Sequence, residues 1–498
     1  MRLNALISFL LLAPTLYVYS QPGTATLTRV QNENLEVVNI EVPAKYLGNF
    51  PAGKSLKVPP GYLIKVFYAG GMKKPRFLCF DSKGVLHAAD QGNGNIYAMP
   101  DKNNDGVADT MFLVASGFKD SHDVKFYEGA MYVTDSIRVW KCVDANGDGL
   151  YESRSIFIDS IGYGAAKGGH HTRTIVFDSI NHKAYLSIGS SCNVCRENRK
   201  AIIEQYNDDG TGKKTYATGI RNAVGMAIHP VTNKLWANNN GSDWEGNEIP
   251  PEWINIIREG GFYGHPFAYG NQVWFNFNAY PDYKALLPIT SADSANVKKM
   301  MEPAALIRAH SAPMALTFLN NSFPSKYNKG MLTALRGSWN SPKSFRGYKV
   351  VYLDLSSASD TTVNYVSDFI DGFLTDTINR VYWGRPVGLE IDKSGAVYLS
   401  SDEKNMFILK IYPEFPNGIR QEKKKSGVEI YPNPADGEIT IKNYELGITN
   451  EYRVTNVPGE TLFTGHLTKT ETLLDISSLS KGVYFIHVGS SVLKFVKD

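Results

Sequence analysis

One two-strand unit recurs along this chain, and that repetition restricts the fold more than any other feature of the sequence. Each copy has an apolar strand, a short turn that often contains glycine, and a second strand that ends in small polar residues. Six copies occupy 76–90, 122–135, 173–190, 224–240, 314–335 and 387–402. Mostly β repeats spaced by roughly 50 residues are typical of a propeller, whose blades bury their faces only against neighbouring blades. We therefore expect a six-bladed β-propeller, because a two-sheet sandwich would not explain six repeats.

We expect the propeller to occupy residues 61–413, after an irregular lead-in at 21–60. The 28 Tyr, 24 Phe and 44 Gly favour many short strands and turns, and 43% apolar residues suffice for a large core. The wider intervals at 244–310 and 340–384 are interpreted as insertions between strands. The longest stretch with a helical pattern lies near 251–258.

The first 20 residues have the pattern of a secretory signal peptide. Arg2 supplies the positive start, and the apolar run at 6–16 is too short to span a bilayer. The alternative is a buried N-terminal strand. No other stretch has the length and hydrophobicity of a transmembrane segment, and a net charge of +3 does not indicate a nucleic-acid or membrane-surface partner. We expect the mature protein to leave the cytoplasm.

After residue 413 the repeat stops. Residues 414–427 are polar, charged and interrupted by one proline and two glycines, which indicates a linker; its Lys423–Lys425 run fits a solvated linker better than a basic patch. Residues 428–498 form about seven short strands in the expected arrangement of a small β-sandwich. The predicted fold class is thus all-β throughout.

Four cysteines are too few for a disulfide-built scaffold, so the core must supply the stability. The Cys192–Cys195 motif could be a redox CxxC, half of a zinc site, or a local disulfide that closes a loop. No second CxxC or HxxxH partner is present. We favour the local disulfide, although the sequence alone does not choose among the three pairings that Cys79, Cys142, Cys192 and Cys195 allow.

Two polar loops between strands have the alternating oxygen ligands of a calcium loop, with glycine at the sharp turn. The candidate ligands are Asp101, Asn103, Asp105 and Asp109 in the first loop, and Asp144, Asn146, Asp148 and Glu152 in the second. The flanking helices and the bidentate glutamate of an EF-hand are missing. Structural calcium and a plain polar turn remain the two alternatives, and catalytic calcium is not expected in these loops.

Titratable residues recur at the start of the inner strands. Counting back from the last apolar residue of each inner strand, the same short interval contains His170, His171, Arg221, Asn222, His310, Arg385, Arg76 and His122. The inner strands of a propeller run in the same direction, so these side chains should meet at one end of the central channel. Arginines there suit an anion or a quinone, and a histidine can accept a proton. No GxSxG, HExxH, P-loop or Rossmann motif is present.

Residues 60–413 resemble the glucose/sorbosone dehydrogenase family of six-bladed propellers that use pyrroloquinoline quinone (PQQ). The matching segments are GGHHTRTIVFD (168–178), YLSIGSSCNVC (185–195), YATGIRNAVGMAIHP (216–230), NNNGSDWEGNEIPPEWINIIREGGFYGHP (238–266), HSAPMALTF (310–318) and GSWNSPKSFRGYKVV (337–351).

This resemblance implies His170 as the base that takes the substrate proton and Arg221, beside Asn222, as the partner of the reactive quinone oxygen. It implies that the Gly241 and Ser242 carbonyls hold a calcium ion that bridges to PQQ. The expected cofactor contacts also include Lys343, Arg346, Arg385 and His310. His171 adjoins His170, and Arg336 replaces the histidine that commonly precedes the GSWN segment.

The tail resembles the type IX secretion C-terminal sorting domain. The matching residues are Tyr431–Ala435, the turn at 479–482 and the closing Lys494–Val496. The resemblance implies that the type IX secretion machinery exports the protein across the outer membrane. The tail is then removed or used for attachment to the cell surface.

We therefore expect a secreted quinoprotein that depends on PQQ and calcium and has a small sugar as its substrate. It would oxidise the anomeric hydroxyl of an aldose to a lactone, or an aldosone to its acid, and pass electrons to an external acceptor that the sequence does not specify. One alternative is a calcium-dependent lactonase, which needs carboxylates and asparagines around an axial metal where this chain has histidines and arginines. The other is a non-enzymatic surface module that binds glycans.

Overall fold

The computed structural model describes residues 23–161, 169–341, 344–357, 359–414, 428–443, 451–467, 470–488 and 491–498. The predicted signal peptide, Lys343 and linker residues 415–427 lie outside the described residues. The chain divides into two compact units, Met1–Asn417 and Gly418–Asp498, and each is treated by itself below.

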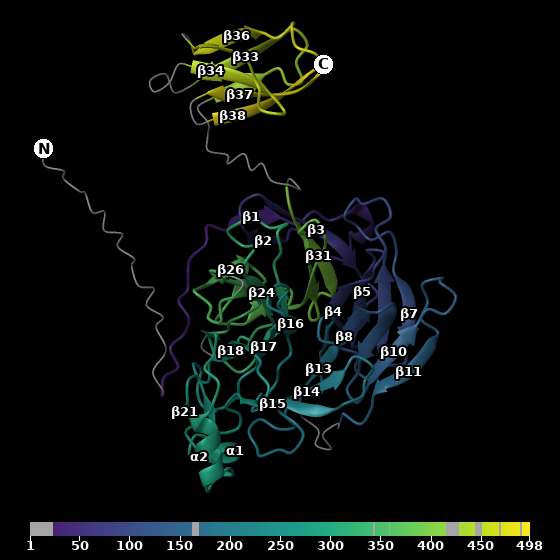
Figure 1. Ribbon diagram of the computed structural model, residues 1–498, viewed down its shortest axis with the longest axis vertical. Helices are drawn as coiled ribbons and strands as arrows, with labels where there is room; N and C mark the ends of the chain where they lie inside the picture. Colours follow the sequence, from purple (N-terminus) through teal and green to yellow (C-terminus); the bar gives the residue numbers. More distant parts are fainter. Residues whose placement is uncertain are drawn as a thin grey trace, which may run out of the picture. The chain divides into compact units, whose positions relative to one another are not determined.

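The first unit contains six sheets of four or five strands, in which almost all neighbouring strands pair antiparallel (Figure 1). The first two are β4 (Pro75–Phe80), β5 (Leu86–Asp90), β6 (Asn95–Met99), β7 (Phe112–Ser116), and β8 (Asp123–Tyr127), β9 (Ala130–Thr134), β10 (Val139–Val143), β11 (Ser153–Ile158). The next two are β12 (Ile175–Asp178), β13 (Lys183–Ile188), β14 (Ile202–Asn207), β15 (Lys214–Thr218), and β16 (Met226–Ile228), β17 (Leu235–Asn239), β18 (Glu252–Ile256), β22 (Ala305–Ile307). The last two are β23 (Pro313–Phe318), β24 (Met331–Leu335), β25 (Lys349–Leu353), β26 (Val366–Ile370), and β29 (Pro386–Ile391), β30 (Val397–Ser401), β31 (Phe407–Pro413), β3 (Tyr62–Ala69).

The first strands of these sheets form a closed ring. Strand β4 lies beside β8, and the contacts continue through β12, β16, β23 and β29 back to β4. The ring closes because β3, the first long strand of the unit, pairs with β31, the last one. Each predicted repeat supplies the first two strands of one blade, so the predicted six-bladed propeller is confirmed.

The second strands of most blades are buried along their whole length, which places the core on both faces of each sheet. The expectation of a helix near 251–258 was wrong. Residues Glu252–Ile256 form β18, the third strand of the fourth blade, and all five are buried. A short apolar run that is buried on every side has the same sequence pattern in a strand and in a helix.

The insertion between β18 and β22 contains the α-helices of the unit among the described residues. It includes β19 (Gly261–Phe262), which joins the third blade, β20 (Ala268–Tyr269), β21 (Val273–Trp274), α1 (Pro281–Lys284) and α2 (Ser291–Lys298). Thr290 and Asp293 form a capping box that starts α2. The remaining elements are β1 (Glu36–Asn39), η1 (Ala44–Tyr46) and β2 (Ser55–Val58) in the lead-in, and β27 (Leu374–Asp376) with β28 (Val381–Tyr382) before the last blade. No described helix is long and apolar enough to cross a membrane.

The second unit consists of two antiparallel sheets. One has β32 (Val428–Tyr431), β33 (Glu438–Asn443) and β36 (Glu471–Asp475); the other has β35 (Thr461–His466), β34 (Glu451–Asn456), β37 (Gly482–Val488) and β38 (Ser491–Lys497). Buried residues of both sheets, such as Ile439 and Ile486, belong to one core. The expected small β-sandwich is confirmed.

Candidate functional site

His170 lies in the segment that enters the inner strand β12, and its ring is held in one orientation. Nδ1 lies 3.0 Å from the carbonyl oxygen of Ser190 and 2.9 Å from the Ser190 hydroxyl. That hydroxyl donates its own proton to the carbonyl oxygen of Cys192 at 2.7 Å. Nδ1 therefore carries the ring proton and donates to Ser190, which leaves Nε2 as the unprotonated nitrogen.

The surroundings of His170 favour its neutral form. Burial, and then the positive charge of Arg221, hold the pKa of His170 well below its usual value of 6.5. A neutral imidazole with a fixed Nδ1 proton is able to accept a proton at Nε2. His170 therefore has the state that a general base requires near neutral pH.

His171 has different surroundings, although it is adjacent in sequence. Its Nδ1 lies 3.3 Å from the carbonyl oxygen of Gly169, and it interacts with His122 of the second blade, whose pKa is held well below its usual value by burial and then by Arg76. Arg76 donates from Nε to His122 at 3.2 Å. Of the two adjacent histidines, the one that contacts Ser190 and is influenced by Arg221 is His170.

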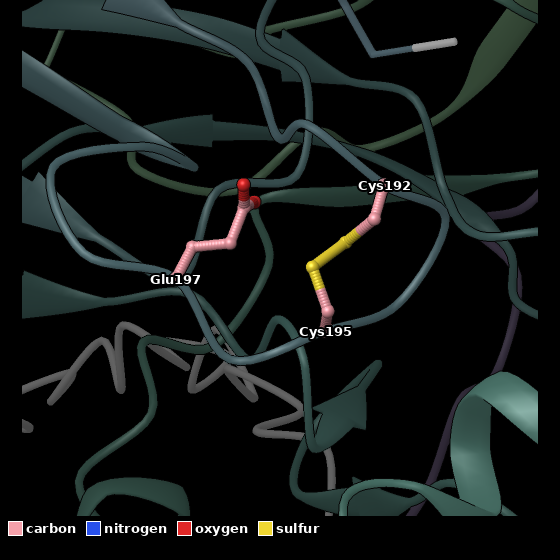
Figure 2. A group of neighbouring side chains, drawn as sticks. All are labelled: Cys192, Cys195 and Glu197. Carbon is pink, nitrogen blue, oxygen red and sulfur yellow. A yellow bond between two sulfur atoms is a disulfide. The ribbon is translucent and has the colours of Figure 1, made fainter. Parts of the chain in front are cut away.

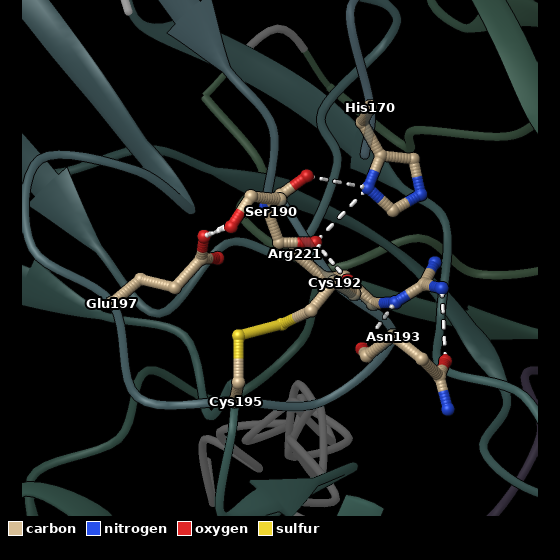
Figure 3. The surroundings of a disulfide bond; sticks show 8 residues. His170, Ser190, Cys192, Asn193, Cys195, Glu197 and Arg221 are labelled. Carbon is tan, nitrogen blue, oxygen red and sulfur yellow. Dashed lines mark hydrogen bonds between the residues drawn. A yellow bond between two sulfur atoms is a disulfide. The ribbon is translucent and has the colours of Figure 1, made fainter. Parts of the chain in front are cut away.

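Arg221 precedes the next inner strand, β16, and its guanidinium is buried (Arg221 is 6% exposed). Nε donates to the carbonyl oxygen of Asn193 at 2.9 Å and Nη2 donates to the Asn193 side chain at 3.0 Å, as Figure 3 shows. Asn193 lies inside the Cys192–Cys195 disulfide loop. The loop therefore orients the guanidinium.

The sulfur atoms of Cys192 and Cys195 are bonded to each other, with Glu197 nearby (Figure 2). Glu197 accepts hydrogen bonds from the Ser191 backbone N–H at 2.7 Å and from the Ser191 hydroxyl. Because bonded sulfurs are not thiolate ligands, the structure contradicts the zinc alternative and agrees with the predicted local disulfide. Cys79 and Cys142 are free.

Removal of this disulfide is expected to disturb Arg221 more than the fold. A Cys192→Ser, Cys195→Ser double variant should lose about 2 kcal/mol of unfolding free energy, since the loop is short. Its turnover in the reaction that the resemblance implies should fall about tenfold, because Asn193 then orients the guanidinium poorly. A Cys79→Ser variant is the control, and equal turnover in the double variant and the wild type would contradict the orienting role.

Gly189 allows the segment that contains His170 to approach the segment that contains Asn222. A Cβ atom at this position would lie 2.6 Å from the Cβ atom of His170 and 2.7 Å from Oδ1 of Asn222, so any larger residue would push them apart. Ser190, the next residue, donates its backbone N–H to the carbonyl oxygen of Arg221 at 2.8 Å. Gly189 and Ser190, directly after β13, thus join His170, Asn222 and Arg221 into one cluster.

Asp243 connects this cluster to the fifth blade, and the sequence analysis did not identify it. Its carboxylate accepts from Nη2 of Arg221 at 3.3 Å and from the side chain of Asn340, and it lies 3.8 Å from Nδ1 of His310. Nε2 of His310 lies 2.8 Å from the carbonyl oxygen of Gly246. His310, predicted from its place before an inner strand, therefore reaches the Arg221 cluster through Asp243.

Gly241 and Ser242 precede Asp243 and pack tightly against the fourth blade. A Cβ atom on Gly241 would approach Cγ of Pro250 to 2.8 Å, and its backbone N–H donates to the buried Glu252 at 2.6 Å. Burial raises the pKa of Glu252 to about 7. Two carboxylates, those of Asp243 and Glu252, therefore flank the backbone segment for which the resemblance implies a calcium site.

Arg385, a predicted cofactor contact, and two further arginines, Arg336 and Arg76, form ion pairs at the same mouth. Arg385 donates to Glu403 at 2.9 Å and Arg336 donates to Asp402 at 2.9 Å, while Arg76 also pairs with Asp402. These three arginines face two carboxylates, which leaves an excess of positive charge. Nη2 of Arg385 also donates to the carbonyl oxygen of Gly337 at 2.5 Å, in the segment that contains Asn340.

Arg346 has a similar arrangement on the fifth blade. Its guanidinium donates to both oxygens of Glu248, at 2.7 and 2.8 Å, and Arg308 donates to the same carboxylate at 3.2 Å. Two arginines thus share one carboxylate. Lys343, expected beside Arg346, lies outside the described residues.

The two candidate calcium loops lie away from this mouth, because each connects the third and fourth strands of its blade. In the second loop the carboxylates of Asp144, Asp148 and Glu152 have oxygens within 4.8 Å of one another. The first loop forms no such group among the described residues; its Asp101 carboxylate accepts from the backbone N–H groups of Asp105 and Gly106. Calcium binding in either loop stays a prediction.

Comparison with known proteins adds a family assignment. The model of the TrAA12-like family matches residues 56–249 and 258–411, and the model of the secretion system C-terminal sorting domain matches residues 429–498. An uncharacterized protein of Borreliella burgdorferi is 28% identical over 372 residues, which cover 72% of this chain and 91% of that protein.

Solved structures share the fold of the first unit. The holo form of the pyranose dehydrogenase PQQ domain from Coprinopsis cinerea has a TM-score of 0.60 and 19% identity, and the match covers 75% of this chain and 100% of that one. The calcium structure of Trichoderma reesei Carbohydrate-Active Enzymes Family AA12 has a TM-score of 0.61 and 18% identity, with 73% and 99% covered. The apo form of the soluble aldose sugar dehydrogenase from Escherichia coli has a TM-score of 0.50 and 16% identity, with 71% and 99% covered.

The family match covers most of the first unit, and the expected resemblance to PQQ-dependent propellers with a C-terminal sorting domain is confirmed. The chain belongs to the TrAA12-like family and is an oxidoreductase of the quinoprotein class.

Proposed function

We propose that this protein is an exported, calcium-dependent dehydrogenase that uses PQQ to oxidise the anomeric hydroxyl of an aldose to a lactone, or an aldosone to its acid. The observation that supports this most directly is the cluster of His170, Arg221 and Asn222 around Gly189 at one mouth of the propeller. A hydride-abstracting reaction on a sugar needs a base for the hydroxyl proton and a cation for the charge that develops on the acceptor.

The residues at the mouth fit PQQ, which is a planar quinone with three carboxylates. Arg76, Arg336 and Arg385 outnumber Asp402 and Glu403, so the group keeps an unmatched positive charge for an anionic ligand. Arg221 and Asn222 would hold the reactive edge of the quinone, with Arg346, Arg385 and His310 as further contacts.

The backbone near Gly241 fits a calcium ion. Calcium prefers oxygen ligands, and the Gly241 and Ser242 carbonyls lie in a segment flanked by the carboxylates of Asp243 and Glu252. The calcium structure of the T. reesei relative supports this assignment. Two structural relatives, a pyranose dehydrogenase and an aldose sugar dehydrogenase, support a sugar as the substrate.

Each side chain of the cluster then has one task. The chemistry that PQQ supplies when bound is acceptance of a hydride from the substrate carbon. Nε2 of His170 accepts the proton of the substrate hydroxyl, and Ser190 keeps the Nδ1 proton in place throughout. Arg221 stabilises negative charge beside Asn222, and Asn193 together with Asp243 keeps its guanidinium from turning away.

The C-terminal unit supports export. The sorting-domain match indicates that the type IX secretion system carries the protein to the cell surface or beyond it. We propose that a signal peptide at residues 1–20 directs the first step and that the tail is removed or used for surface attachment afterwards. The disulfide of the site is consistent with folding outside the cytoplasm.

The direct test is reconstitution of the purified full-length chain with PQQ and calcium. We expect reduction of an artificial dye with aldoses, no reduction without PQQ, and loss of activity on calcium chelation that added calcium reverses. Identification of the lactone by mass spectrometry separates oxidation of an aldose from oxidation of an aldosone. Failure of PQQ to bind under these conditions would refute the proposal, and sugar binding without dye reduction would favour a glycan-binding module.

A further inference from the structure

Two tryptophans and one tyrosine form an exposed aromatic cluster beside the candidate site. Trp244 is 47% exposed, Trp339 is 56% exposed and Tyr280 is 41% exposed. The Trp244 and Trp339 rings meet edge to face at 5.5 Å, and Tyr280 stacks on Trp244 at 5.7 Å. Large aromatic rings that are this exposed and in mutual contact keep apolar surface available to a ligand.

The cluster is attached to the catalytic cluster through consecutive residues. Trp244 directly follows Asp243, which accepts a hydrogen bond from Arg221, and Trp339 directly precedes Asn340, which donates to the same Asp243 carboxylate. The Trp244 and Trp339 rings therefore belong to residues that are adjacent in sequence to Asp243 and Asn340, and Asp243 binds Arg221. A ligand that lies on these rings is adjacent to the reacting centre.

Trp244 is held in a costly backbone conformation. Its φ is +78°, a region in which a bulky residue rarely lies. The segment keeps this conformation through the Asp243 N–H bond to Asn193 at 2.8 Å and the bridge between Gly246 and Ile249. Strain of this kind persists where the surrounding contacts over-determine it, and it is concentrated at ligand-binding sites. In Trp244 the strained backbone leaves the indole ring exposed to solvent.

Polar groups suited to hydroxyls lie along the same segments. Glu248, four residues after Trp244, is 59% exposed in its side chain and pairs with the exposed Arg308. Arg346 binds the same carboxylate. Its backbone N–H donates to the hydroxyl of Ser338, the residue before Trp339. Aromatic faces beside carboxylate and guanidinium groups match a pyranose ring, which has apolar C–H faces and hydroxyls around its edge.

We propose that Trp244, Trp339 and Tyr280 form an outer subsite that stacks a second sugar ring, so that the natural substrate is the reducing end of an oligosaccharide. This inference rests on the proposed function for the position of the oxidised ring at His170. The aromatic cluster would add affinity for the neighbouring ring and leave the chemistry at His170 unchanged.

Binding of sugars to the full-length chain without added PQQ tests the subsite separately from catalysis. Titration calorimetry with glucose, cellotriose, maltotriose and laminaritriose is expected to give at least one trisaccharide that binds about tenfold more tightly than glucose. Trp244→Ala and Trp339→Ala should each remove most of that advantage, whereas Trp339→Phe should retain much of it. Trp274→Ala is the matched control, because Trp274 is also exposed (37%) but contacts Phe277 instead of the cluster.

The outcomes separate the two proposals. Equal affinity for glucose and all three trisaccharides, or unchanged trisaccharide affinity in both alanine variants with wild-type melting temperatures, overturns the subsite. With PQQ and calcium present, the variants should raise KM for the preferred trisaccharide and leave KM for glucose and kcat unaltered. Trisaccharide binding that depends on the tryptophans, in a protein that reduces no dye, would keep the subsite and refute the dehydrogenase proposal.

Discussion

Replacement of His170 by alanine is expected to lower kcat for dye reduction by a factor of about 10² to 10⁴ while PQQ binding is retained. The variant lacks the Nε2 atom that we propose accepts the substrate proton, but it keeps Arg221 and the arginine excess that would hold the cofactor. His171→Ala is the matched control, since His171 contacts Gly169 rather than Ser190, and its kcat should stay within a few-fold of wild type.

The pH profile gives an independent reading of the same residue. Burial and Arg221 lower the pKa of His170, so its base form is lost only as the pH falls well below 6.5. The acid limb of kcat/KM for the wild type should therefore lie well below pH 6.5, and the His170→Ala variant should lack this limb. A large loss of kcat in His171→Ala with a small loss in His170→Ala would reverse the assignment.

The sequence predicted the inner half of each blade because those strands alternate with glycine turns and repeat. The outer strands lack this regularity, and the closure of the ring by β3 depends on pairing between residues that are more than 300 positions apart in the chain. The 251–258 stretch was misassigned because its burial on all sides removes the alternation that distinguishes a strand. Local patterns therefore predicted the repeat, but not the way in which the repeats join.

In the candidate site, too, the sequence predicted residues that follow a local pattern but not residues that depend on contacts between blades. His170, Arg221, Asn222 and His310 were predicted because each precedes an inner strand, and the structure places them close to one another. Asp243 and Asn340 were missed, although both belong to segments that resemble the family, since their importance comes from one contact between the fourth and fifth blades. The ion pairs of Arg385 and Arg346 with Glu403 and Glu248 could not be predicted either, because the acidic partners lie in other loops.

A second large effect is expected at Arg221. Arg221→Lys keeps the positive charge but lacks the forked donors that bind Asn193 and Asp243 together, so kcat should fall by a factor of about 10² to 10³. Arg154→Lys is the control, because Arg154 is an exposed arginine of the second blade that donates to the carbonyl oxygen of Ser116. Its kcat should remain near that of the wild type.

The comparison of kcat with PQQ affinity decides what Arg221 does. If Arg221 stabilises charge that develops during the reaction, the lysine variant should lose kcat and change the PQQ dissociation constant only a few-fold. The lost hydrogen bonds would then be stronger in the transition state than in the bound ground state. A loss confined to PQQ affinity, with normal kcat at saturating PQQ, would instead reduce Arg221 to an anchor for the cofactor. In that case the hydrogen bonds that Arg221 donates to Asn193 in the disulfide loop would serve binding of PQQ rather than catalysis.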